Sequence, residues 1–129
     1  MKPLQVNNSP RGQLSTEEFC NFPFEPKRFF ITSKIPQGET RGKHAHRRES
    51  QVLICLSGQI RLINESQSGV SQQTLRPNEC FFLDKLVWSE QVYEEEGTVL
   101  LCFCSENFDE DEYIRNKEEF YDIVNKDKR

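Results

Sequence analysis

The sequence contains two histidines, His44 and His46, which stand two positions apart. On a β-strand, residues two apart point to the same face, so both imidazoles are expected to enter one space. A neutral imidazole has a pKa of about 6.5, which suits the removal and return of a proton. Two neutral imidazoles are costly to bury without partners, so simple core packing is the weaker explanation. The pair therefore predicts a site of proton transfer.

Positive charge surrounds the two histidines, on Arg41, Lys43, Arg47 and Arg48. Nearby cations lower the pKa of an imidazole and favour its neutral, basic form. The same cations attract an anionic substrate. Arg47 and Arg48, taken singly, also fit a solvated strand edge.

The spacing around the histidines matches a known signature. Gly38, His44, His46, Gln51 and Gly58 stand as in the first sequence signature of the cupins, in which a glutamate normally occupies the position of Gln51. The chain therefore resembles the cupins, with a neutral and weaker ligand in place of a carboxylate.

The donor set argues against a metal centre. In metal-binding cupins the two histidines and the glutamate are ligands, together with a third histidine from a second signature. The corresponding region here, around residues 84–89, offers Trp88 and Ser89 but no histidine. Iron, zinc and manganese sites need three or four good donors, and two imidazoles with an amide fall short. We therefore expect no metal and no other cofactor.

Several longer segments resemble one branch of the cupins, the WxcM-like sugar-nucleotide 3,4-ketoisomerases. The similarity runs from about Asn21 to Val124 and includes two motifs that are not general cupin features. The matching segments are residues 27–30, 41–46, 51–58, 86–90, 111–116 and 119–120.

The resemblance implies a metal-free jelly-roll homodimer that acts on a dTDP-linked 4-keto-6-deoxyglucose. The carbonyl would move from carbon 4 to carbon 3 of the hexose through an enediol or enediolate. We expect His46 to be the main base that removes the proton on carbon 3. His44 would shuttle the proton or polarise a sugar oxygen, and the two roles could be reversed.

The resemblance also implies residues that bind the substrate. Arg41 is the candidate for holding the diphosphate or the oxyanion, and Gln51 would form a hydrogen bond within the pocket. Trp88 would form a wall beside the sugar or base, and Glu90 would orient a histidine or a hydroxyl group. Arg28, in the matching Lys-Arg segment, completes the expected binding set.

The sequence departs from the family in the strand that follows this Lys-Arg pair. Members carry a tyrosine there, in a strand that lines the pocket, whereas this chain has phenylalanine and isoleucine at 29–31. Tyr93 and Tyr113 are the candidates to replace a pocket phenol. The departure leaves room for a changed substrate or weak activity.

Three other functions stay open. A 3- or 5-epimerase of a deoxyketo sugar nucleotide also removes a proton beside a ketone. A 3,5-epimerase usually pairs histidine with a carboxylate, and the sequence shows no His-Asp spacing of that kind. A non-catalytic cupin that binds a sugar nucleotide is favoured by the missing tyrosine. A metal-dependent cupin oxygenase is disfavoured by the incomplete ligand set.

The elements that position these residues are mostly short strands. Eight runs rich in Val, Ile, Leu, Phe and Thr alternate with turn signals, which predicts an all-β jelly roll. They cover residues 28–33, 43–47, 51–56, 59–64, 70–75, 80–83, 86–93 and 98–104. The runs at 51–56 and 98–104 are apolar on both faces, which makes a homodimer plausible.

The two ends of the chain differ from this pattern. Residues 1–13 are polar and are expected to form a loosely ordered arm. Phe120, Ile123 and Val124 stand at helical spacing, so a short amphipathic helix is expected to close the domain within 109–125. We expect one cupin domain over 1–129.

The composition indicates which classes of partner and which cellular compartment to expect. The net charge is −4 and no basic block occurs, which disfavours binding to nucleic acid. No apolar run approaches the roughly 20 residues that a membrane helix needs. The five cysteines are odd in number and include no Cys-x-x-Cys pair, so we expect a reducing, cytoplasmic compartment without disulfides.

Overall fold

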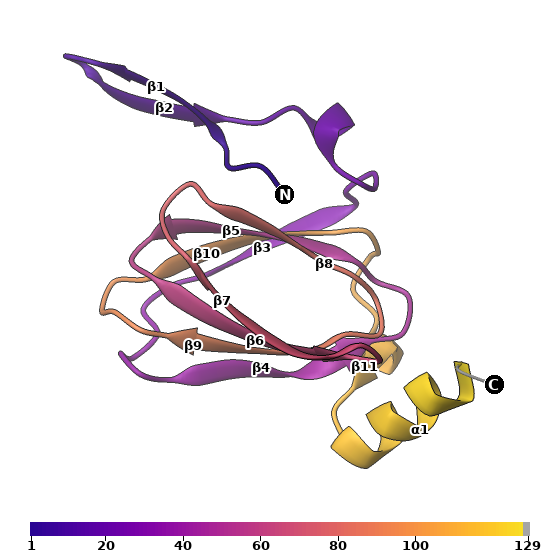
Figure 1. The fold of residues 1–129 in the computed structure, drawn as a ribbon. Helices are drawn as coiled ribbons and strands as arrows, with labels where there is room; N and C mark the ends of the chain where they lie inside the picture. Colours follow the sequence, from indigo (N-terminus) through magenta and orange to yellow (C-terminus); the bar gives the residue numbers. More distant parts are fainter. Residues whose placement is uncertain (128–129) are drawn as a thin grey trace.

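Two antiparallel sheets face each other in the computed structural model, which describes residues 1–127 (Figure 1). The four-stranded sheet has the order β3-β10-β5-β8, and the five-stranded sheet has the order β11-β4-β9-β6-β7. This arrangement confirms the expected all-β jelly roll. The first sheet contains β3 (Arg28–Thr32), β5 (Gln51–Ser57), β8 (Cys80–Leu83) and β10 (Val99–Cys104). The second contains β4 (Thr40–His46), β6 (Ile60–Ser66), β7 (Gly69–Leu75), β9 (Trp88–Tyr93) and β11 (Tyr113–Ile114).

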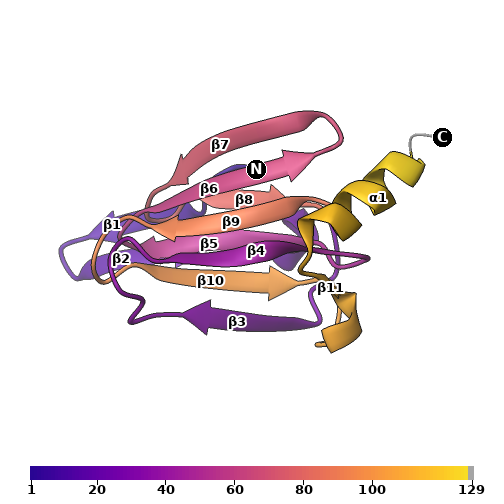
Figure 2. The ribbon, with the colours of Figure 1, turned by 90° about the horizontal axis from the view of Figure 1, so that it is seen from below.

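The main core lies between the two sheets, where inward side chains alternate along each strand. Leu53, Ile60, Leu62, Tyr93 and Leu100 are fully buried there. β3 and β7 lie at opposite edges of the sandwich (Figure 2). All eight predicted strands are present, although β4 begins earlier and β9 later than the apolar pattern suggests.

The N-terminal arm is a β-hairpin rather than the loosely ordered segment expected for residues 1–13. β1 (Gln5–Ser9) pairs in regular register with β2 (Gly12–Thr16), and both extend away from the sandwich (Figure 1). Their side chains are almost all exposed, so no apolar face signals the strands in the sequence. Asn78 ties the base of the hairpin to the sandwich through Leu4 N and Ser15 Oγ.

The C-terminal segment contains the expected short helix, although the helix does not fill the whole of 109–125. A 3₁₀ turn, η2 (Glu110–Glu112), leads into β11, and the helix α1 spans Lys117–Asp127. Phe120 and Val124 of α1 pack on Trp88 and Ala45, on the outer face of the five-stranded sheet. No helix within the described residues is long and apolar enough to span a bilayer. Residues 128 and 129, the end of the expected domain, lie outside the described residues.

A second apolar layer covers the outer face of the four-stranded sheet. Val52 and Ile54 of β5 pack there against Phe22 and Phe24, which belong to the segment around the 3₁₀ turn η1 (Phe19–Asn21). β5 is therefore buried on both faces by its own chain, as its continuous apolar run indicates.

Candidate active site

A β-bulge in β4 determines which side chains enter the interior. Arg41 pairs with Gln91 and His44 pairs with Ser89, so β4 holds one extra residue between these pairs. Gly42 and Lys43 supply the bend, with φ of 88° and 59°. A bulge changes the alternation of side chains, so Arg41 and His44, three apart, face the same way.

The resulting cavity measures about 310 Å³ and opens between β3 and β4. Arg28, Arg41, His44 and Gln51 of the predicted site line it together. The other lining residues are Phe30, Thr32, Gly42, Gln91, Phe108 and Tyr113. His46, which is 4% exposed, lies just behind this wall.

The two imidazoles and one phenol ring form a triangle. The ring centroids of His44 and His46 are 4.9 Å apart, and Tyr113 lies 4.9 Å from His44 and 4.6 Å from His46. Tyr113 pairs with His46 across β11 and β4, which brings its side chain to the same face. The expected convergence of the two histidines is thus present, with a phenol beside them.

His44 is held by the bulge itself. Its Nδ1 atom lies 3.1 Å from the carbonyl oxygen of Gly42. A carbonyl only accepts, so Nδ1 carries the hydrogen and Nε2 keeps its lone pair. Burial lowers the pKa of His44, the hydrogen bond to Gly42 opposes this, and Arg115 lowers the pKa further.

His46 is neutral at physiological pH. Burial, followed by the neighbouring His44, lowers its pKa to about 4. A neutral imidazole in this setting can accept a proton from a carbon acid beside a ketone.

Glu49 is part of the site, although no motif in the sequence points to it. Its side chain is only 1% exposed, and its Oε2 atom lies 3.6 Å from His46 Nδ1. Arg28 Nη2 lies 3.1 Å from Oε1, and Gln51 Nε2 donates to Oε2 at 2.7 Å. The available signal in the sequence was a carboxylate three residues after His46.

Trp88 and Glu90 lie away from the cavity, which corrects their expected roles beside the sugar. Ser89 and Gln91 of β9 face inward, so Trp88 and Glu90 face outward. Trp88 packs against Phe120 of α1, and its Nε1 atom donates to Glu90 at 3.0 Å.

The pocket phenol comes from β11 rather than β3. Phe30 of β3 lines the cavity without a hydroxyl group, while Tyr113 lines it with one. Burial raises the pKa of Tyr113, and the charge and hydrogen bond of Arg28 work against that rise. Tyr93 is fully buried, with its hydroxyl group 2.7 Å from Thr32 Oγ1.

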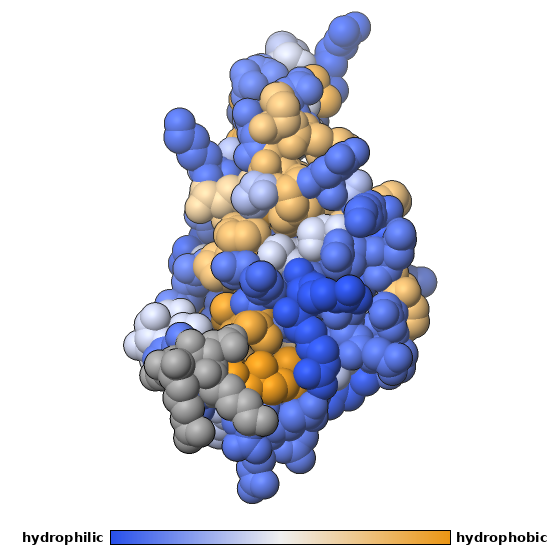
Figure 3. Space-filling model, turned by 90° about the vertical axis from the view of Figure 1, so that its right-hand side faces the viewer, coloured by the Kyte–Doolittle hydropathy of each residue, from blue (hydrophilic) through white to orange (hydrophobic). Residues whose placement is uncertain are grey.

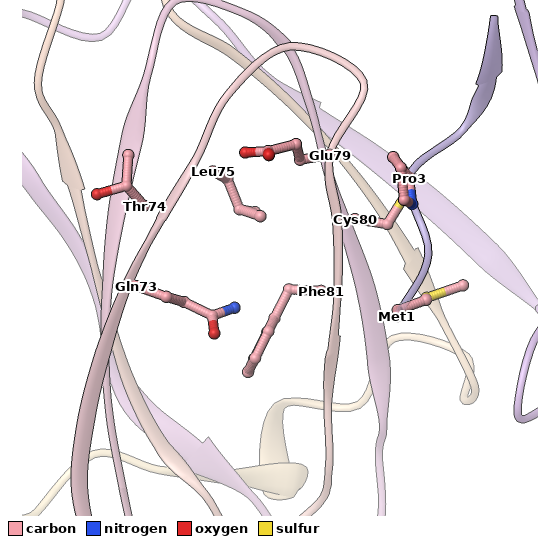
Figure 4. Close-up of a pocket in the computed structure, with 8 residues that line it drawn as sticks. All are labelled: Met1, Pro3, Gln73, Thr74, Leu75, Glu79, Cys80 and Phe81. Carbon is pink, nitrogen blue, oxygen red and sulfur yellow. The ribbon is translucent and has the colours of Figure 1, made fainter.

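The described residues contain no group of three or more His, Cys, Asp or Glu side chains able to hold a metal ion. The amide of Gln51 stands where a cupin metal site would use a carboxylate. Another cavity of about 310 Å³ lies between β7 and β8 (Figure 4). It is lined by Gln73, Leu75, Phe81 and neighbouring side chains and contains none of the predicted site residues.

Comparison with known proteins places this geometry in a family. The family model described as "WxcM-like, C-terminal" matches residues 1–125. This chain belongs to the WxcM-like family. The resemblance seen in the sequence is therefore confirmed over nearly the whole chain.

One curated relative of this WxcM-like chain is the TDP-4-oxo-6-deoxy-alpha-D-glucose-3,4-oxoisomerase of Aneurinibacillus thermoaerophilus. It is 33% identical over 118 residues, which cover 90% of this chain and 85% of that protein.

Two solved structures share its fold closely. A mutant 3,4-ketoisomerase from Thermoanaerobacterium thermosaccharolyticum, in complex with TDP-4-keto-6-deoxyglucose, superposes with a TM-score of 0.90 at 31% identity, covering 97% and 92% of the two chains. A 3,4-ketoisomerase from Helicobacter canadensis has a TM-score of 0.89 at 33% identity, covering 95% and 94%.

Proposed function

We propose that this chain is a sugar-nucleotide 3,4-ketoisomerase that converts dTDP-4-keto-6-deoxyglucose into a dTDP-3-keto-6-deoxyhexose. The observation that carries the proposal is the convergence of His44, His46 and Tyr113 around one cavity with Arg28 and Arg41 on its wall. The relatives described above support the substrate class.

The reaction is proton transfer within one sugar. His46, neutral because its pKa is lowered to about 4, takes the proton from carbon 3, which the ketone at carbon 4 acidifies. An enediolate forms, and a proton returns to carbon 4 while the carbonyl forms at carbon 3. Carbon 3 is oxidised as carbon 4 is reduced, so the balance needs no external oxidant or redox cofactor.

His44 is the proposed partner of His46. Its Nε2 lone pair faces the cavity because Gly42 holds Nδ1, so it can receive a hydroxyl proton or shuttle one between carbons. His44 itself lines the cavity wall. The alternative is therefore the reverse assignment, in which His44 is the base.

The cations are proposed to bind the charged parts of the substrate. Arg41 is exposed at the rim of the cavity, which suits a diphosphate. Arg28 is engaged by Glu49 and lies deeper, where it can stabilise the enediolate oxygen. Gln51 is proposed to orient the deepest part of the sugar.

A homodimer is part of the proposal. β3 is an edge strand whose outer face exposes Phe29 by 61% and Ile31 by 53%. Phe19, 56% exposed, extends this face. Hydrophobic side chains also gather in the upper middle of the surface seen in Figure 3. An apolar face next to an open sheet edge suits a second copy, because a two-fold pairing covers both at once.

The cellular setting is proposed from the thiols and the product. The five cysteines are free in the structure, which suits a reducing cytoplasm. A 3-keto sugar nucleotide is the substrate class of an aminotransferase, so a 3-amino sugar for a surface glycan such as an O-antigen is the proposed end use.

The test is to incubate metal-stripped protein with dTDP-4-keto-6-deoxyglucose in deuterated buffer and to follow the sugar by NMR. A 3-keto product with deuterium at carbon 4 is expected. Substrate that stays unconverted and unlabelled would overturn the proposal. Parallel reactions with His46→Asn and His44→Asn show which histidine is the catalytic base. The variant that lacks this base should lose deuterium exchange at carbon 3 while still binding nucleotide.

A second candidate is a deoxyketo-sugar epimerase. The contact between His46 and Glu49 supplies the histidine–carboxylate pairing that this reaction class uses, and Tyr113 supplies a phenol. Deuterium entry at carbon 3 or 5 without movement of the carbonyl would favour this reaction in the same experiment.

A further inference from the structure

The carboxylate of Glu49 is buried at a cost that the fold alone does not explain. Its side chain is 1% exposed, in a turn directly after β4. A buried carboxylate loses its hydration and must be compensated by charge and hydrogen bonds. Arg28 and Gln51 supply that compensation.

The surrounding chain fixes where the carboxylate lies. Glu112 accepts hydrogen bonds from the backbone N–H groups of Arg48 and Glu49, at 2.7 and 2.9 Å. Arg47 N also donates to the Glu112 carbonyl oxygen. These bonds hold the turn between β4 and β5 and direct Glu49 back toward His46.

The contacts of His46 define one tautomer. Gln51 Nε2 donates to Glu49 at 2.7 Å, which identifies this atom as the amide nitrogen. The same nitrogen lies 3.4 Å from His46 Nε2. An amide nitrogen only donates, so Nε2 of His46 must be the acceptor and carries no hydrogen. Nδ1 then carries the hydrogen. It is buried without a hydrogen-bond partner, and Glu49 Oε2 lies 3.6 Å from it.

We propose that Glu49 is a positioning residue that holds His46 in the Nδ1–H tautomer and leaves Nε2 as the proton-accepting atom. The role rests on the proposed function, because His46 needs a defined basic nitrogen only if it removes a proton. Glu49 also stabilises the imidazolium that His46 becomes after proton removal. Burial raises the pKa of the Glu49 carboxyl, and the hydrogen bond from Gln51 and the charge of Arg28 oppose that rise.

The tautomer can be read without any turnover. Long-range ¹H–¹⁵N NMR spectra of the unmodified protein at neutral pH distinguish a protonated Nδ1 from a protonated Nε2. A protonated Nδ1 on His46 is expected, and a predominant Nε2–H form would overturn the proposal whether or not the protein isomerises a sugar.

The matched variants are Glu49→Gln, which keeps the shape and removes the charge, and Glu118→Gln on the exposed face of α1 as the control. Glu49→Gln is expected to mix the two tautomers of His46 and to lower kcat about 100-fold or more, with KM changed less than about threefold. Glu49→Asp should restore part of kcat, and the control should match the unmodified protein.

Two results separate failure of this role from failure of the function. Unchanged kcat and an unchanged His46 tautomer in Glu49→Gln would overturn the positioning role and leave the isomerase intact. The second result is an unmodified protein that lacks isomerase activity but carries the hydrogen on His46 Nδ1, with Glu49→Gln disturbing that tautomer. It would overturn the function and support the positioning role. If Glu49→Gln does not fold, the tautomer of His46 in the unmodified protein still tests the positioning role.

Discussion

Among single residues, His46 sets the pH range of the proposed reaction. Burial, followed by the nearby His44, lowers its pKa to about 4, so the base stays deprotonated well below pH 6.5. We expect kcat/KM to stay flat from pH 8 down to about pH 5 and to fall only below it. Rate measurements across this range check the prediction, and an acid limb near pH 6.5 would exclude His46 as the base.

Tyr113 is expected to contribute through its hydroxyl group, because it supplies a phenol at the cavity where β3 has Phe30. Removal of the hydroxyl in Tyr113→Phe keeps the ring against both imidazoles and should lower kcat by about 10²-fold. Steady-state kinetics beside a Tyr121→Phe control, on the outer side of α1, measures the effect. Equal rates for both variants would show that the phenol plays no part.

The site residues were predictable from the sequence wherever strand alternation alone determines which way a side chain points. His44 and His46 share a face because they are two apart, and Gln51 begins the next strand. Arg41 enters the cavity only because the bulge shifts the alternation, and tertiary pairing reveals that bulge. Trp88 was misplaced because β9 faces inward through its polar residues, Ser89 and Gln91, which an apolar pattern does not select.

At the level of elements, the turn between β4 and β5 depends on Glu112. Its buried carboxylate accepts bonds from two backbone N–H groups and from Arg48 Nε. Glu112→Gln loses the charge and one acceptor oxygen, so the free energy of unfolding should fall by about 1–3 kcal/mol. Urea denaturation measures it, and a change below about 0.5 kcal/mol would contradict the role.

The pH dependence of this contribution has a defined sign. Burial alone would raise the pKa of Glu112, but the hydrogen bonds from Arg48 and Glu49 outweigh it, and the net pKa is lowered from 4.5. A lowered carboxyl pKa stabilises the folded state above the unfolded pKa and loses this effect as the pH falls through the folded value. The stability difference between the unmodified protein and Glu112→Gln should therefore shrink below about pH 4.5.

The elements that the sequence did not reveal are short or polar. β1 and β2 have exposed polar side chains, and β11 has two residues. A two-residue strand has no period, so only pairing with His46 and Ala45 defines it. The longer strands were predictable because apolar side chains at β spacing must be buried between sheets.

For the whole molecule, the exposed apolar face of β3 should decide the oligomeric state. Ile31→Lys places a charge in the proposed interface and should convert a dimer into a monomer, as light scattering after size-exclusion chromatography would show. Val70→Lys is the control, because Val70 is similarly exposed but lies on β7, at the opposite edge. A monomeric unmodified protein would contradict the proposed dimer.

The bulge at Gly42 and Lys43 has a consequence for how this site could change over generations. The inward side chains have odd residue numbers before the bulge, as at Arg41, and even residue numbers after it, as at His44 and His46. Deleting Lys43 would remove the extra residue, so Arg41, His44 and His46 would follow one regular alternation and still share the inward face. Insertion of a single codon into an ancestral regular strand could therefore have created the bulge while the cation and the two imidazoles stayed in the same cavity.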